Sequence, residues 1–162
     1  MSSTEIRRAR AVAHLAEGYV LASVEVAAPS DRVFRALASE EIVRWWVRPG
    51  VFDTREWTGD VRVGGHWRTS GDSSRGPYSL GGEFLVIEPA HALVHTWQAV
   101  GTPAVLSTVT YLLESLAEGT RITLRHQGFA SREGCANTGV GWETSFEQLA
   151  VSLGAPPAPD RG

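Results

Sequence analysis

The spacing of apolar residues changes along the chain, and each pattern predicts a different element. Residues 19–27 are rich in β-branched side chains, which predicts a strand. Two short helices should follow, because Pro29 and the polar residues after it open one, and Ser39 opens the other. Pro49-Gly50 should end the second helix. The first third of the chain therefore predicts one strand and two short helices.

From Arg55 to Gln127 apolar residues recur at every second position, which predicts about six antiparallel strands joined by short loops. The alternation is clearest over residues 106–113 and 120–127, which Glu118-Gly119 should join as a hairpin. Consecutive strands usually pair, so a single sheet is expected. On the last two strands the positions predicted to face inward are Val109, Tyr111, Leu113, Ile122, Leu124 and His126.

The last regular stretch, residues 141–153, predicts a helix. Trp142, Phe146, Leu149 and Leu153 recur at helical spacing and form one wide apolar stripe, while the glycine-rich run before them predicts a loop. Such a stripe needs a large apolar partner, and a sheet of this length must curl to provide it. The predicted fold class is α+β, a helix grip. In it, a curved antiparallel sheet of about six or seven strands wraps around a long C-terminal helix and leaves a cavity between them.

Length and composition indicate one globular domain. The chain has 162 residues, 43% of them hydrophobic, and a net charge of −3 with both signs interspersed. A chain of this length and hydrophobic content can form a hydrophobic core. The sequence lacks the block of basic residues that nucleic-acid binding requires. The single cysteine excludes an intrachain disulfide. No apolar run reaches the roughly 18 residues of a membrane span and no signal peptide is recognisable, so a cytoplasmic location is expected.

The two ends of the chain differ from the middle. Residues 1–18 are polar with scattered apolar side chains, and they predict an N-terminal arm or a short helix. Residues 154–162 are rich in proline and predict a disordered tail. The folded domain is therefore expected to span residues 19–153.

Several short motifs occur in an order that resembles a known superfamily. Residues 20–153 resemble the START-like SRPBCC superfamily, whose helix-grip fold is also called Bet v-like. Within it they are similar to the group related to the activator of the heat-shock-protein-90 ATPase (Aha-like). The resemblance implies one START-like domain, and members of the superfamily include lipid carriers, polyketide cyclases and aromatases, drug-sequestering proteins and co-chaperone domains. The motifs that carry the resemblance are Val33-Phe34-Arg35-Ala36-Leu37, Trp45-Trp46, Val63-Gly64-Gly65-His66-Trp67-Arg68, Gly82-Glu83, Glu88-Pro89, Leu93-Val94-His95-Thr96-Trp97, Val109-Thr110, Gly119-Thr120-Arg121 and Gly141-Trp142.

An aromatic-lined cavity is expected between the last helix and the sheet. Two interpretations stay open: the aromatic side chains enclose a flat apolar ligand, or they are ordinary core residues. Glycine pairs at 64–65 and 81–82 matter here, because a bulge at either pair would turn the residues beyond it to the other face. The expected lining is drawn from Trp45, Trp46, Trp67, Tyr78, Phe84, Trp97, Tyr111, His126, Trp142 and Phe146.

Three residues are weak candidates for acid–base catalysis. His95 and His126 share the parity of the core positions and could each serve as a general base, a ligand anchor or a metal ligand, and Glu83 could orient His95 or Arg68. The alternatives are two hydrogen-bonded interior histidines and a solvent-facing Glu83. The histidines lack metal-ligand spacing and Cys135 stands alone, so neither a metal nor a cofactor is expected. All 15 basic residues are arginines, which excludes a Schiff-base lysine.

Three functions are compatible with the sequence. The first is binding of a small hydrophobic or aromatic molecule, which requires only the cavity. The second is a polyketide cyclase/aromatase-like or hydrolase-like enzyme, which needs two polar groups within reach of one reacting atom. The third is a domain that modulates a chaperone ATPase, which needs an exposed docking surface. The expected partner is a small hydrophobic molecule, neither nucleic acid nor a membrane, and a homodimer is left open.

Overall fold

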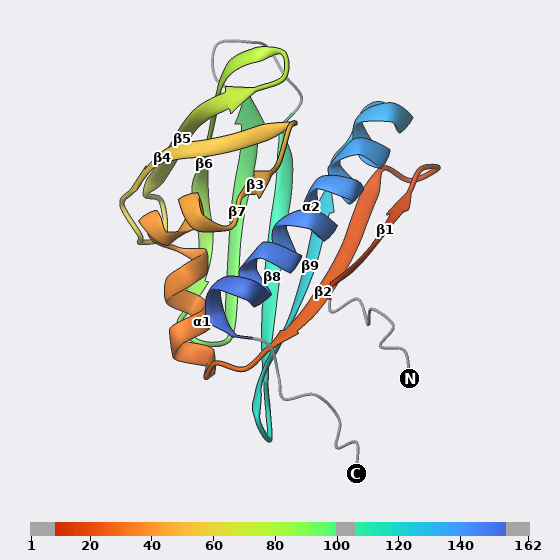
Figure 1. Cartoon of the computed structure of the whole chain (residues 1–162). Coiled ribbons are helices and arrows are strands. Elements are labelled where there is room, and N and C mark those ends of the chain that lie inside the picture. The colour runs from red at the N-terminus through yellow and green to blue at the C-terminus, as the bar shows by residue number, and fades with distance from the viewer. Residues whose placement is uncertain (1–8, 100–105, 155–162) are drawn as a thin grey trace, which may run out of the picture.

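Figure 1 shows the computed structural model of the chain, which describes residues 9–99 and 106–154. Within these residues nine strands form one antiparallel sheet that curves around a long C-terminal helix, which confirms the helix grip. The predicted number of six or seven strands is too low. In chain order the elements are β1 (Arg10–His14), β2 (Tyr19–Val26), α1 (Ser30–Leu37), the 3-10 helix η1 (Glu40–Arg44), β3 (Val47–Arg48), β4 (Phe52–Gly59), β5 (His66–Ser73), β6 (Gly76–Glu88), β7 (Ala92–Ala99), β8 (Ser107–Leu116), β9 (Gly119–Gln127) and α2 (Arg132–Leu153).

The order of the strands places the pair formed by the first two strands beside the last one. Across the sheet the order is β1-β2-β9-β8-β7-β6-β5-β4-β3. From β3 to β9 each strand pairs with the next one along the chain, whereas β2 pairs with β9. The helices α1 and η1 carry the chain from β2 to the opposite edge, where β3 begins. One concave face results, and α2 lies on it (Figure 1).

Two short strands at the edges were not predicted. Residues Arg10–His14, predicted as part of an arm or a short helix, form β1 and pair with β2. A segment of five residues is too short to show a clear alternation of apolar and polar side chains. Its strand conformation depends on hydrogen bonds and packing with the neighbouring strand, which the local sequence does not reveal. The N–H of buried Ala9 donates to the Glu147 carboxylate at 3.0 Å, which attaches this segment to α2. At the other edge, β3 has only two residues.

The C-terminal helix begins at Arg132 and not at Gly141. The Ser131 hydroxyl caps it and accepts a hydrogen bond from the Gly134 N–H at 2.9 Å. The glycines that predicted a loop therefore lie inside α2, because tertiary packing outweighs their low helix propensity. A Cβ atom on Gly139 would lie 3.3 Å from the Cβ atom of Ala13, so the missing side chain lets α2 approach β1 closely.

The aromatic stripe of α2 is buried against the concave face. Trp142, Phe146 and Leu149 are buried, as predicted. The backbone of α2 runs close to β1 and β2 on one side and to β3 on the other, while aromatic side chains fill the space above the middle strands. The inward positions predicted on β8 and β9 are also buried: Val109, Tyr111, Leu113, Ile122, Leu124 and His126.

The described residues contain no helix that is both long and apolar enough to cross a membrane. Of the predicted disordered tail, residues 155–162 lie outside the described residues. Gly154 is described, and its carbonyl oxygen accepts a hydrogen bond from the Ala27 N–H at 2.9 Å. The end of α2 is thereby joined to the end of β2.

Replacing Phe146 by alanine should lower the free energy of unfolding by about 3–5 kcal/mol, because the ring is fully buried and its loss leaves a cavity. Chemical denaturation of the purified variants measures this change. The matched control is Val151→Ala, which removes an exposed side chain of the same helix and should change the value by less than about 0.5 kcal/mol. Equal effects of the two substitutions would contradict the packing described for α2.

Candidate functional site

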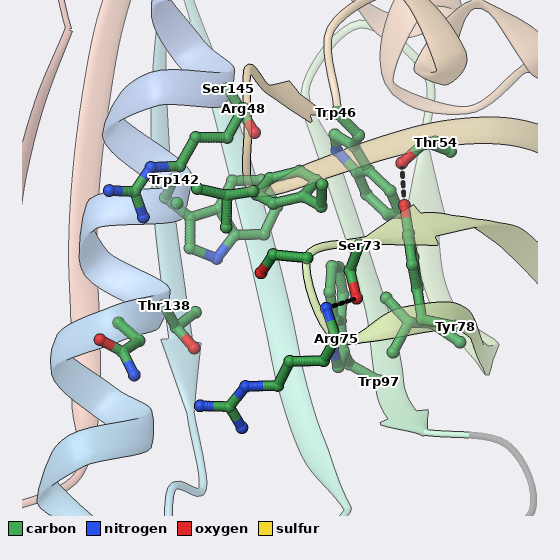
Figure 2. Close-up of a pocket in the computed structure, with 16 residues that line it drawn as sticks. Trp46, Arg48, Thr54, Ser73, Arg75, Tyr78, Trp97, Thr138, Trp142 and Ser145 are labelled. Atoms are coloured by element: carbon green, nitrogen blue, oxygen red, sulfur yellow. Dashed lines mark hydrogen bonds between the residues drawn. The ribbon is translucent and has the colours of Figure 1, made fainter.

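A cavity of about 480 Å³ opens between α2 and the strands from β3 to β7 (Figure 2). It lies where the sheet curves away from the N-terminal half of the helix. The helix contributes one wall, and the strands with the β5–β6 turn contribute the other. The lining consists of Trp46, Arg48, Val51, Phe52, Thr54, Ser73, Ser74, Arg75, Tyr78, Leu80, Trp97, Asn137, Thr138, Gly141, Trp142 and Ser145.

Three indole rings form the apolar part of this lining. The ring centroids of Trp46 and Trp97 are 4.9 Å apart, those of Trp97 and Trp142 5.7 Å, and those of Trp46 and Trp142 6.1 Å. The rings are tilted or perpendicular to one another, which is the favourable arrangement for aromatic pairs. Each ring comes from a different element: Trp46 follows η1, Trp97 lies on β7 and Trp142 on α2.

A chain of hydrogen bonds under the cavity fixes the Trp142 ring. Its Nε1–H donates to Nδ1 of His126 at 3.0 Å, so the ring proton of His126 is on Nε2. That Nε2–H donates to the Ser107 hydroxyl at 2.8 Å, and Ser107 in turn donates to the Trp97 carbonyl oxygen at 3.2 Å. Each donor in this series of three hydrogen bonds has an acceptor. The His126 imidazole must be neutral to accept a hydrogen bond from Trp142. Burial, followed by repulsion from His95, lowers the pKa of His126 to about 3.

His95 is the second buried histidine on the inner face. Its Nδ1 lies 2.9 Å from the carbonyl oxygen of Thr96 and donates to it. Burial lowers the pKa of His95 to about 4, although this hydrogen bond acts in the opposite direction. The imidazole packs at 5.0 Å from the Trp67 ring and at 6.1 Å from the Phe84 ring. Neither His95 nor His126 lines the cavity.

Two buried polar atoms lie beside the indole cluster. The Tyr111 hydroxyl and Nε1 of Trp46 have no partner at hydrogen-bond geometry within the described part of the chain. Burial raises the pKa of the Tyr111 phenol well above its usual value, and the nearby Trp46 N–H only partly opposes this. Tyr111 therefore remains a neutral phenol that packs edge-on against Trp142, with 6.0 Å between the ring centroids.

Glu83 does not face His95 or His126. It is exposed on β6 and faces away from its buried neighbour Phe84, which pairs with His95. A bulge in the β6–β7 pairing follows Phe84, so the glycines at 81–82 do not turn Glu83 inward. Glu83 instead borders a second hollow of about 800 Å³ on the outer face of the sheet, with His66, Arg68 and other residues. The hypothesis that Glu83 orients His95 is therefore wrong, and orientation of Arg68 by Glu83 stays a prediction.

The polar part of the cavity lining comes mostly from β3 to β6. The hydroxyls of Thr54 and Tyr78 are hydrogen-bonded to each other, and burial raises the pKa of Tyr78. Arg48 is the second residue of β3, and Arg75 lies in the turn between β5 and β6. Figure 2 shows both arginine side chains extending toward α2. No Asp, Glu or His occurs among the lining residues that the structure describes.

The predicted lining residues fall into two groups. Trp46, Tyr78, Trp97 and Trp142 line the cavity, and their role in ligand binding stays a prediction. The others do not line the cavity and are buried in the core, as expected for ordinary core residues. They are Trp45, Trp67, Phe84, Tyr111, His126 and Phe146.

Most of the polar lining comes from residues without a predictive sequence pattern. Arg75 lies in a stretch that reads as an ordinary polar loop, and it meets α2 only because the sheet curves. Asn137 and Thr138 lie in the helical segment that was predicted as a loop. The one local signal for that segment was Ser131 followed by an acidic residue, Glu133, which is typical of a helix N-terminus.

No metal-binding group is evident in the described residues, where no three His, Cys, Asp or Glu side chains cluster. Cys135 is a free, buried thiol whose Sγ points to the carbonyl oxygen of Tyr19 at 3.5 Å. Burial raises the pKa of this thiol, which makes it a poor nucleophile. It is therefore a packing residue of α2 against β2.

Comparison with known sequences finds one family. The sequence model of the family described as activator of Hsp90 ATPase homolog 1-like protein matches residues 27–154, which is most of the domain. The comparison with curated protein sequences finds no match. The matched segment runs from the end of β2 to the end of α2, so it includes every residue that lines the cavity.

Solved structures share the fold. Protein CV1439 from Chromobacterium violaceum superposes with a TM-score of 0.77 at 24% identity, covering 88% of this chain and 99% of that one. CalU16 from Micromonospora echinospora gives a TM-score of 0.65 at 26% identity, covering 92% and 85%. DynU16, a protein from the dynemicin biosynthetic locus, gives 0.65 at 22% identity, covering 92% of this chain and 49% of that one. These likenesses establish the helix-grip architecture.

Acidification should destabilise the protein through its two buried histidines. In the unfolded chain both bind protons near pH 6.5, whereas in the folded chain the pKa values are about 4 for His95 and about 3 for His126. Between the folded-state pKa values and pH 6.5, the unfolded state therefore binds more protons than the folded state. The stabilisation is complete above about pH 6.5 and is lost as the pH falls, at up to about 1.4 kcal/mol per pH unit for each histidine.

The measurement is the free energy of unfolding between pH 4 and pH 7 for wild type and His126→Gln. The variant should show the shallower pH dependence, because one buried titrating group is gone. His66→Gln, which removes an exposed histidine of β5, is the matched control. A wild-type slope in His126→Gln would show that the His126 imidazole is not kept neutral by burial.

Proposed function

This chain belongs to the family of activator of Hsp90 ATPase homolog 1-like proteins, and from that premise we propose that it binds a small aromatic or other hydrophobic molecule in the cavity between α2 and the sheet. The observation that carries the proposal is the cluster of Trp46, Trp97 and Trp142 at the base of an open cavity. Flat indole surfaces favour flat apolar ligands, because stacking adds to the gain from removing apolar surface from water.

The volume and the chemistry of the lining support a binding role. A cavity of about 480 Å³ falls within the range of small-molecule sites, which are mostly apolar with a few polar groups that set orientation. Here Thr54 and Tyr78 supply paired hydroxyls on one wall, and Ser145 supplies one from α2. Trp142 is held in place by its hydrogen bond to His126, so the apolar surface is formed before a ligand arrives.

Binding is favoured over catalysis by the location of the titratable groups. A general base must reach the proton that it removes, directly or through one water. His95 and His126 are buried below the cavity, with pKa values near 4 and 3, and their hydrogen bonds to Thr96 and Ser107 are directed into the protein. In the described lining the titratable side chains are Tyr78, Arg48 and Arg75, and none of them is a base at neutral pH.

A polyketide cyclase/aromatase-like activity is the second candidate. DynU16 shares the fold and comes from the dynemicin biosynthetic locus, although the likeness is one of architecture. Such an activity would have to position a flexible chain against the indoles, with the Tyr78 phenol as the acid. Product formation from a poly-β-ketone substrate, lost in Tyr78→Phe while tight binding persists, would replace the proposed binding function by the enzymatic one.

Filling the cavity from α2 should abolish binding. Gly141 lines the cavity, and a Cβ atom there would meet only Cε1 of Phe52, at an ordinary contact distance of 3.9 Å. Gly141→Leu should therefore fold and should gain helix propensity, by up to about 1 kcal/mol. Its leucine side chain occupies the space next to the indoles. We expect tryptophan fluorescence titrations with polycyclic aromatic and fatty-acyl compounds to show saturable quenching in wild type and at least about tenfold weaker binding in this variant.

The matched control is Val140→Leu, which enlarges the adjacent, partly exposed helix position outside the cavity lining. It should bind as wild type does. Unchanged affinity in Gly141→Leu would place the bound compound elsewhere and would refute the proposed site. Circular dichroism of both variants verifies that they are folded.

A further inference from the structure

We propose that the ligand of this cavity is an amphipathic anion, an apolar and preferably aromatic body that carries an oxyacid group held by Arg48 or Arg75. The inference rests on the proposed binding function and adds the charge and the orientation of the ligand. The charge of the cavity lining is opposite in sign to the net charge of the chain. The chain has a net charge of −3, yet the described cavity lining contains two arginines and no carboxylate.

Neither guanidinium group is engaged by another residue of segments 9–99 and 106–154. The structure describes no ion pair and no side-chain hydrogen bond for Arg48 or Arg75. Five other arginines are paired with carboxylates, whereas Arg68 on the outer face, like Arg48 and Arg75, has no ion pair that the structure describes. The five are Arg32 and Arg35 with Glu41, Arg55 with Asp53 and Asp72, Arg62 with Asp60, and Arg121 with Glu25 and Glu114. The donors of Arg48 and Arg75 are therefore available to a ligand.

The two arginines are presented by ordered backbone. Arg48 is a half-buried residue of β3, two positions after Trp46. Arg75 lies in the β5–β6 turn, where the Ser73 hydroxyl accepts from the Arg75 N–H at 3.2 Å and donates to the Gly76 carbonyl oxygen at 2.7 Å. Figure 2 shows both side chains reaching from the sheet toward α2, with Thr138 between their ends in the view. The two guanidinium groups lie at different heights along α2, so either of them can meet the polar end of a ligand.

The position of the charges relative to the indoles sets the orientation of the ligand. Trp46 and Trp142 are buried at the base of the cavity, whereas Arg75 is exposed at its rim. An apolar body at the indoles thus places its polar end at the rim, where the arginines lie. A planar guanidinium group donates two parallel hydrogen bonds to an oxyacid group, which makes arginine well suited to this contact. A neutral hydrophobic ligand would leave both arginines without a role.

The experiment compares two fluorescent probes that differ only in the charged group. 8-Anilino-1-naphthalenesulfonate carries a sulfonate, and N-phenyl-1-naphthylamine has the same aromatic body without it. We expect the sulfonate to bind about tenfold more tightly, as charge-assisted hydrogen bonds at a partly exposed site provide. Added salt should weaken binding of the sulfonate alone. In competition, 2-naphthoate should displace the sulfonate more strongly than 2-naphthamide, which extends the preference to carboxylates.

Variants test the assignment to the two arginines. Arg48→Gln and Arg75→Gln should each reduce the preference for the anionic probe, and the double variant should abolish it while still binding the neutral probe. Arg68→Gln is the matched control, since it removes the same charge from the outer face, where Arg68 borders the second hollow. It should retain the wild-type preference.

Each other outcome has a definite meaning. Equal affinities for the two probes in the wild type, both lost in Gly141→Leu, would overturn this inference and leave the proposed binding function standing. A preference that the double variant retains, or that Arg68→Gln removes, would also overturn it. Failure of both probes to bind would overturn the proposed binding function and this inference together.

Discussion

The hydrogen bond from Trp142 to His126 is the contact on which the rest of the site depends. The indole lies where α2 crosses the concave face, and its ring contacts Trp45, Trp97 and Phe146 on three sides. Burying an indole N–H without an acceptor is costly, and neutral His126 supplies the acceptor while passing its own proton toward Ser107. One buried histidine thereby fixes the rotation of Trp142, and through it the apolar surface that borders the cavity.

The cavity itself follows from the way α2 meets a curved sheet. Gly139 brings the helix close to β1 at one edge, and the helix then diverges from the middle strands, where aromatic rings fill most of the gap. Gly141 leaves the remaining space open, because it has no side chain to occupy it. The glycines of α2 thus act in two ways: one permits close packing and the other preserves a hollow. The arginines at 48 and 75 lie on the opposite wall and give that hollow its positive charge.

Alternation and helical spacing predicted the inner face of β8 and β9 and the buried stripe of α2, since those patterns arise directly from which side chains must leave water. They did not predict the start of α2 at Arg132, because glycine propensity is a local property and the packing of Gly139 on Ala13 is not. They also did not separate the indoles that line the cavity from aromatic residues such as Phe84 that lie in the core. All of these aromatic side chains are predicted to point inward. The curvature of the sheet decides which of them reach the open space. Arg75 lacked any pattern, since a turn residue joins a site only through the fold.

The most direct test of the account is an NMR titration of the indole Nε1–H signals with 8-anilino-1-naphthalenesulfonate. The chain has six tryptophans, so each signal can be assigned by single Trp→Phe variants. If the ligand binds between α2 and the sheet, the signals of Trp46, Trp97 and Trp142 shift with saturation. The signal of Trp57, which lies on β4 and does not line the cavity, remains in place. Saturable shifts of Trp57 without changes in those three signals, or no shift in any of them, would contradict a ligand site between α2 and the sheet.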